Sequence, residues 1–310
     1  MFTTFTELRQ HALTTLPVQR CAVAGAANRH ALEAVFAAAA EGYVTPVLIG
    51  PAGPIRGLIE ELGIDGRYEL VDCDPLANPA QLAVDLVRAG EADFILKGGL
   101  QTADLLRPIL NKATGLNDSG FITHFGLMQL AGYPKLLAMS DAAVIPRPTL
   151  EDKVRIVAAG VRTLRQLGIP RPVVAALCAA ENVSEKMPET LDALRLSQLA
   201  AEGEFGDAVV LGPISYDLAT SAESAAIKGY DNPHAGNVDL LLVPELVTGN
   251  VMSKIWNADH RNLLAGCLIG ARVPVGLTSR SASMAEKLNS LLLCSVLSAA
   301  GARPDQESLT

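Results

Sequence analysis

The stretch DFILKGGLQTADLLRP, residues 93–108, begins as a short apolar run, turns at two glycines and continues with apolar residues at helical spacing. A buried strand followed by a glycine turn and an amphipathic helix is the repeating unit of parallel sheets. The same order of strand and helix recurs along most of the chain. This stretch therefore predicts an α/β fold with right-handed crossovers.

Further apolar runs end at glycine, proline or a polar residue and alternate with Ala- and Leu-rich segments of helical spacing. The expected strands are 21–26, 45–50, 68–73, 93–98, 172–178, 208–213, 239–244 and 273–278. The rhythm breaks at 121–147, where two extended runs joined by AGYP predict a hairpin. Because it restarts afterwards, we expect a domain junction near 141–150 and a second α/β domain.

The composition limits the class of protein. The chain has 310 residues, of which 49% are hydrophobic and 4% aromatic, which is enough for two cores built on Ala, Leu and Val. A formal charge of −8 argues against a nucleic-acid partner, because that function needs a basic face. The apolar segment 291–302 is shorter than the roughly 20 residues of a membrane span, so no membrane is expected. It is either buried in its own domain or part of a dimer contact.

The cysteines and the N-terminus indicate the compartment. Five widely spaced cysteines without a CxxC pair predict reduced thiols rather than disulfides or a metal site. Cys178 and Cys267 lie in apolar runs and are expected in the core. The first residues carry Glu7 and Arg9 and lack the apolar region of a secretory signal. We therefore expect a cytoplasmic protein.

Polar residues gather where three of the predicted strands end. The first group contains Lys97, Gly98, Thr102 and Arg107, the second Asn250 and Lys254, and the third Thr278, Ser279 and Arg280. Each group alone is explained by a helix cap and solvated surface charges. Because the carboxyl ends of parallel strands share one edge of a sheet, the three together predict an anion-binding cleft.

These groups belong to longer motifs. VDLLLVPELVTGNVMSKIWNADHRNLLAGCLIGARVPVGLTSRSASMAEKLNS (238–290) resembles the C-terminal signature of the phosphate acetyltransferase and phosphate butyryltransferase family, and its TSR form looks closer to the butyryl branch. ILKGGLQTADLLRPIL resembles a first-domain segment of that family. AAENVSEKMPETLDA, GPISYDLATSAESAAIKG and NPHAGNVD resemble second-domain segments in the same order, so the resemblance covers about residues 20–295.

The resemblance implies an architecture and an assembly. It implies two α/β domains with mostly parallel sheets, like those of isocitrate and isopropylmalate dehydrogenases, with the active site in the interdomain cleft. The chain would return to its first domain near its end, which gives a first domain of 1–140 plus 277–310 and a second of 141–276. A homodimer is the assembly expected for this family.

The resemblance also implies a reaction. It would interconvert a short-chain acyl-CoA, acetyl or butyryl, and orthophosphate with acyl phosphate and CoA, by direct attack without a covalent acyl-enzyme, metal or redox cofactor. Arg280 and Arg107 would bind phosphate, because a guanidinium pairs with it bidentately. Ser279 would support the developing oxyanion, and Glu286 stands where the acetyl branch has its proposed aspartate base. The remaining residues expected to bind phosphate or CoA are Lys97, Gly98, Thr102, Asn250, Lys254 and Thr278.

Two other functions stay open on the sequence alone. A dehydrogenase with the same architecture would use a nicotinamide and a divalent metal, for which Asp207 and Asp217 offer two carboxylates but no convincing third. GAANRH at 25–30 is too short a match for a dinucleotide-binding motif. The second alternative is a non-catalytic, metabolite-binding α/β protein.

Overall fold

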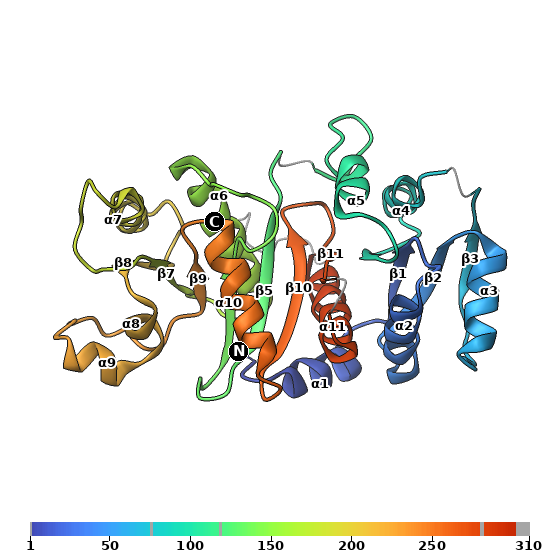
Figure 1. The fold of residues 1–310 in the computed structure, drawn as a ribbon, viewed down its shortest axis with the longest axis horizontal. Coiled ribbons are helices and arrows are strands. Elements are labelled where there is room, and N and C mark those ends of the chain that lie inside the picture. Colours follow the sequence, from blue (N-terminus) through green and yellow to red (C-terminus); the bar gives the residue numbers. More distant parts are fainter. Residues whose placement is uncertain (1, 75–76, 118–119, 280–281, 302–310) are drawn as a thin grey trace. The chain divides into compact units, whose positions relative to one another are not determined.

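The computed structural model describes residues 2–74, 77–117, 120–279 and 282–301. They pack as two compact units, one consisting chiefly of Thr123–Leu263 and the other of Phe5–Ile122 with the segment from Leu264 onward. The second unit is therefore discontinuous in sequence, and Figure 1 shows that it contains both the blue helix near the N-terminus and the red helix that follows the last strand. The domain boundaries expected at 140/141 and 276/277 stay a prediction.

The discontinuous unit is built on a mostly parallel sheet in the order β3-β2-β1-β4-β11-β10. Only β10 runs antiparallel to its neighbour β11 among the described pairs of this unit. Its elements are α1 (Phe5–Thr15), β1 (Gln19–Ala24), α2 (Arg29–Glu41), β2 (Val44–Gly50), α3 (Ala52–Glu61), β3 (Glu69–Asp72), α4 (Pro79–Arg88), β4 (Phe94–Lys97), α5 (Thr102–Ile109), β10 (Leu263–Ile269), β11 (Val275–Gly276) and α11 (Met284–Gly301).

The strands of the other unit are ordered β5-β6-β9-β7-β8. Strands β5 (Thr123–Gln129) and β6 (Leu136–Ser140) pair antiparallel, which confirms the hairpin expected within 121–147. The other elements are α6 (Leu150–Gln166), β7 (Val173–Leu177), α7 (Pro188–Ala201), β8 (Val209–Ile214), α8 (Tyr216–Thr220), α9 (Ala222–Ile227), β9 (Leu240–Leu242) and α10 (Leu246–Ala258). The predicted α/β class with mostly parallel sheets is confirmed.

The apolar segment at 291–302 belongs, as far as it is described, to α11, which lies beside α2 (Figure 1). Leu291, Leu292, Leu293 and Cys294 are each fully buried. They pack within their own unit, against α1, α2 and strands β1, β4 and β11. Of the two explanations the sequence leaves open, burial within the unit is therefore the one observed.

No helix among the described residues combines the length and the apolar character that crossing a bilayer requires. The five cysteines, all of which are described, are free thiols. Cys21, Cys267 and Cys294 are buried. Cys178, expected in the core, is only half-buried, because it follows the last residue of β7 rather than lying within the strand.

Candidate active site

Three neighbouring parallel strands of the discontinuous unit end at the same edge of its sheet. Strand β4 lies between β1 and β11, with Lys97 opposite Ala24 and Leu96 opposite Gly276. Each strand leads through a short loop toward a helix, from β1 to α2, from β4 to α5 and from β11 to α11. The loops that follow Lys97 and Gly276 are two of the three polar groups singled out in the sequence, and parallel pairing brings them together.

The glycines after Lys97 join two of these loops. The amide of Gly98 donates to the carbonyl of Ala24 at 2.9 Å, and that of Gly99 donates to the carbonyl of Gly25 at 2.8 Å. A β-carbon at position 98 would lie 2.2 Å from the carbonyl oxygen of Gly25, so only glycine fits there. This close approach explains the glycine at this position.

A cavity of about 130 Å³ opens between these loops. It is lined by Asn28, His30, Ala31, Lys97, Gly98, Gly99, Leu100, Thr278, Ser279 and Lys287. Four of the residues expected from the sequence therefore line one cavity: Lys97, Gly98, Thr278 and Ser279. Since sites for drug-sized ligands occupy roughly 300–1,000 Å³, this volume suits a small anion or one end of a longer substrate.

The start of α2 contributes to the electrostatics of the cavity. Asn28 caps the helix, with its side-chain oxygen accepting from the amide of Ala31 at 3.0 Å. The positive end of the helix therefore lies at the cavity wall. His30 places Nδ1 3.1 Å from a carboxylate oxygen of Glu33. Asn28 and His30 fall in GAANRH, a segment too short to suggest a site by sequence alone.

Lys287, in the first turn of α11, is the buried charge of the cavity. The residue is 8% exposed, and its Nζ donates to the carbonyl of Ala282 at 2.5 Å. Burial lowers the pKa of this ammonium, while the carboxylates of Glu286 and Glu33 act in the opposite direction. The family resemblance points to the neighbouring Glu286, and no sequence pattern distinguishes Lys287 from a surface lysine.

The other expected residues of this unit lie outside the described lining of the cavity. Glu286 is half-buried in the first turn of α11, where its amide donates to Ser283 Oγ at 3.1 Å. Thr102 is not the helix cap, because α5 begins at Thr102 and Gln101 is the capping position. Arg107 is 75% exposed and lies 3.9 Å from Asp104. Arg280 lies outside the described residues.

The comparisons with known proteins identify the family. The family model described as phosphate acetyl/butaryl transferase matches residues 69–295. The chain belongs to this family. It is 36% identical over 283 residues to the phosphate butyryltransferase of Clostridium acetobutylicum, covering 90% of this chain and 93% of that protein. It is 35% identical over 279 residues to the phosphate acetyltransferase of Thermotoga maritima, covering 90% and 95%.

Solved structures agree with the family assignment. A branched-chain phosphotransacylase from Enterococcus faecalis V583 matches with a TM-score of 0.79 at 30% identity, covering 91% of this chain and 99% of that one. The 4-hydroxythreonine-4-phosphate dehydrogenase of Klebsiella pneumoniae matches with a TM-score of 0.58 at 14% identity, covering 91% and 100%. This second likeness concerns the fold alone, and the family match favours acyl transfer over the dehydrogenase alternative.

The second group of expected phosphate acyltransferase residues lies in the other unit, on α10. Asn250 and Lys254 are one helical turn apart, and the side-chain amide of Asn250 donates to the carbonyl of Ala142 at 3.5 Å. Gly249 is buried, and a β-carbon there would lie 3.0 Å from side-chain atoms of Ala142 and Val243. Gly249 therefore lets α10 pack closely on the loop after β6.

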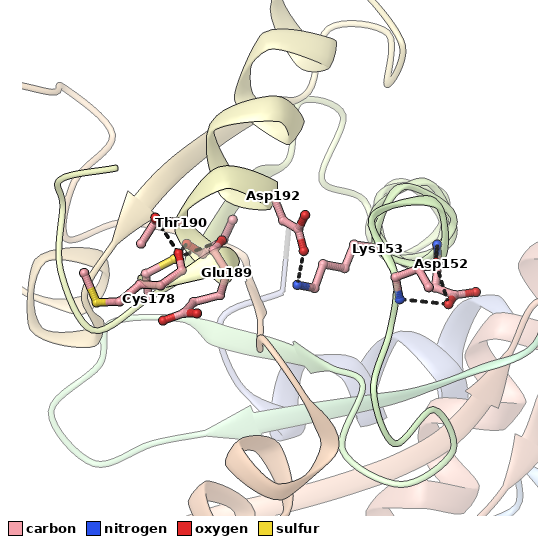
Figure 2. Close-up of polar contacts among 9 residues, drawn as sticks. Asp152, Lys153, Cys178, Glu189, Thr190 and Asp192 are labelled. Atoms are coloured by element: carbon pink, nitrogen blue, oxygen red, sulfur yellow. Dashed lines mark hydrogen bonds and ion pairs between the residues drawn. The ribbon is translucent and has the colours of Figure 1, made fainter. Parts of the chain in front are cut away.

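A separate polar network in this unit surrounds Cys178 and is shown in Figure 2. Lys153, only 5% exposed, contacts Asp192 at 2.6 Å and links α6 to α7. The Cys178 thiol faces the carbonyls of Ala176 and Glu189 at 3.8 and 3.5 Å. Burial raises the pKa of this thiol to about 11, so it is protonated at neutral pH. A protonated thiol is a poor nucleophile.

Proposed function

We propose that this family member transfers a short acyl group between coenzyme A and orthophosphate, forming or consuming an acyl phosphate. The observation that carries the proposal is the cavity at the ends of β1, β4 and β11. It combines a small volume, the positive end of α2, two lysines and the hydroxyls of Thr278 and Ser279. These are groups that bind a phosphate anion and donate to the oxygens of an acyl phosphate.

We assign roles to the residues on chemical grounds. Ser279 donates to the carbonyl oxygen as it becomes an oxyanion, and Lys97 and Thr278 hold phosphate beside it. Arg280, from the family resemblance, adds a bidentate phosphate contact, and Glu286 accepts or returns a proton. The remaining expected residues, Gly98, Thr102, Arg107, Asn250 and Lys254, bind phosphate or CoA in this proposal.

We propose direct attack of a phosphate oxygen on the acyl carbonyl, with CoA leaving as the thiol. The raised pKa of Cys178 supports this proposal, as does the complete burial of Cys21, Cys267 and Cys294. Direct attack needs acyl-CoA and phosphate and no metal or redox cofactor. Turnover that survives treatment with a chelator and dialysis is the expected result.

Thiol release tests the function itself. The protein is mixed with an acyl-CoA and phosphate in the presence of a chromogenic disulfide, and absorbance reports free CoA. The expected result is a signal that requires phosphate. A flat trace with acetyl, propionyl, butyryl and branched donors contradicts the proposal and favours a metabolite-binding protein. A nicotinamide absorbance change with added metal favours the dehydrogenase.

The same assay measures acyl-chain preference. One methylene in an apolar pocket changes the free energy of binding by only about 1–3 kcal/mol, so related chains are all expected to react. We propose a butyryl-type preference from the TSR form of residues 278–280, and the order of kcat/KM across the panel tests it.

We further propose a cytoplasmic homodimer. The family resemblance supports the dimer, and α10 exposes an apolar stripe of Val247, Val251 and Ile255, which are 59%, 51% and 64% exposed. The free thiols support a reducing compartment. Light scattering at micromolar concentration is expected to give twice the mass of the chain, and the monomer mass contradicts the dimer.

A further inference from the structure

The inference concerns Lys287 and rests on the proposed function. Lys287 lines the cavity together with Lys97 and Ser279, yet its residue is 8% exposed. A buried ammonium is costly unless a counter-charge or several acceptors face it. Among the described residues, the charged and titratable groups around it are Glu286 on its own helix, Glu33 and His30 on α2, and Lys97 at the end of β4.

The hydrogen bonds of Lys287 leave donors for a ligand. An ammonium has three N–H groups. In the part of the chain that the structure describes, the acceptor of Lys287 Nζ is the carbonyl of Ala282. The two remaining N–H groups belong to a side chain that forms part of the cavity wall. A phosphate dianion in the cavity would supply both the acceptors and the negative charge.

We propose that Lys287 is a phosphate-binding residue of this acyltransferase, whose ammonium donates to the non-reacting oxygens of orthophosphate and of the acyl phosphate. The bond to the Ala282 carbonyl fixes where the ammonium lies. Since the same oxygens are present in both substrates, the contact acts in both directions of the reaction. It acts on the phosphoryl group and not on the acyl chain or CoA.

Lys287→Met removes the ammonium and keeps a side chain of similar length. We expect the KM for phosphate to rise about 10- to 100-fold, because a hydrogen bond to a charged group is lost. The KM for acyl-CoA is expected to stay within about twofold, since the contact is specific to phosphate. Because burial disfavours the charged amine, the variant is expected to unfold at a temperature no lower than the wild type.

Lys112→Met is the matched control. Lys112 is an exposed lysine of the same unit and lies outside the described cavity lining. Its substitution removes the same charge from the chain as Lys287→Met does. Its kinetic constants should equal those of the wild type. A phosphate KM in Lys287→Met within twofold of this control would overturn the proposal.

The pH dependence of the KM for phosphate is a second test, because a purely structural role of Lys287 would not change it. As pH rises, Lys287 loses its proton earlier than an exposed lysine, because burial lowers its pKa. The wild-type KM for phosphate should therefore rise in the alkaline range. Lys287→Arg stays charged throughout, so the part of this rise that Lys287 causes should disappear. Lys97→Arg should keep the rise, because Lys287 is still present. An unchanged alkaline profile in Lys287→Arg contradicts the assignment.

Calorimetric titration with inorganic phosphate separates this proposal from the proposed function. Phosphate should bind the wild type and bind Lys287→Met at least about tenfold more weakly. If the wild type binds phosphate in this way but releases no CoA, the acyltransferase function fails and the binding role of Lys287 stands. Equal phosphate affinity in both proteins contradicts the binding role of Lys287 and leaves the proposed acyl transfer unaffected.

Discussion

The amide of Gly98 donates to the carbonyl of Ala24 at 2.9 Å, so the loop after β4 is joined to the end of β1. A methyl group at position 98 would overlap the carbonyl oxygen of Gly25 at 2.2 Å, and a backbone atom yields less easily than a side chain. Gly98→Ala is therefore expected to cost about 2 kcal/mol or more of unfolding free energy, measured by urea denaturation.

Gly57→Ala is the control for that variant. Gly57 lies inside α3, and a β-carbon there meets nothing within 4 Å. The substitution should raise the free energy of unfolding by about 0.5–1 kcal/mol, because alanine favours helix. If Gly98→Ala changes the free energy of unfolding as little as Gly57→Ala does, the two loops do not approach each other as closely as described.

Ser279→Ala tests the oxyanion role. Removing the hydroxyl should lower kcat about 100-fold with little change in either KM, because the donor acts on charge that develops in the transition state. Ser283→Ala, in the same loop, removes only the cap bonded to the Glu286 amide at 3.1 Å. It should lose about 0.5–2 kcal/mol of stability and keep its turnover. Unaltered kcat in Ser279→Ala would refute the role.

Asp239→Asn tests a buried ion pair. Asp239 is 3% exposed, contacts Lys135 Nζ at 2.6 Å and accepts from the amide of Val173 at 2.8 Å. Losing its charge leaves a buried ammonium without its partner, which should cost about 3–5 kcal/mol in urea denaturation. Asp259→Asn, which breaks the exposed pair with Arg261, should change stability little. Similar losses of unfolding free energy in both variants would contradict the burial of the Asp239–Lys135 pair.

The Cys178 thiol provides a test against pH. With a pKa of about 11, roughly 0.1% is thiolate at pH 8. Alkylation, located by peptide mass spectrometry, should therefore be slow at neutral pH and accelerate about tenfold per pH unit up to about 11. Since folding raises this pKa, any stability from the protonated thiol is full below about pH 9 and lost as pH rises through about 11.

Cys178→Ala completes that test, since direct attack on the acyl-CoA predicts that it keeps most of its turnover. Rapid alkylation of Cys178 at neutral pH with matching loss of activity would indicate an acyl-enzyme instead.

The fold was predictable from the sequence because strand and helix periodicities are local signals. The segment 172–178 contains β7 at 173–177, for example. Strand β10 (Leu263–Ile269) was missed because its apolar run continues almost directly into β11, and the two pair antiparallel across a short turn. The shared cavity of Lys97 and Ser279 was also predictable, because these residues follow β4 and β11 and the carboxyl ends of parallel strands lie at one edge of the sheet.

Lys287 could not be found in this way. Neighbouring helix residues point about 100° apart. Whether Glu286 or Lys287 turns toward the cavity therefore depends on where α11 begins and how it packs on α2, and neither is encoded locally. Likewise, Gly98 was recognisable as a turn residue, but its contact with Gly25 depends on the pairing of β1 with β4.

The discontinuous unit has a consequence for synthesis on the ribosome. Strand β11 covers the edge of β4, but it emerges only after about 180 further residues, which include the whole of the other unit, have been translated. At about 5–20 residues per second this takes on the order of 9–36 seconds. During that time the nascent chain exposes the unpaired backbone of β4 and the face of α2 that α11 later buries. Newly made chains are therefore expected to depend on chaperones until the last helix leaves the exit tunnel.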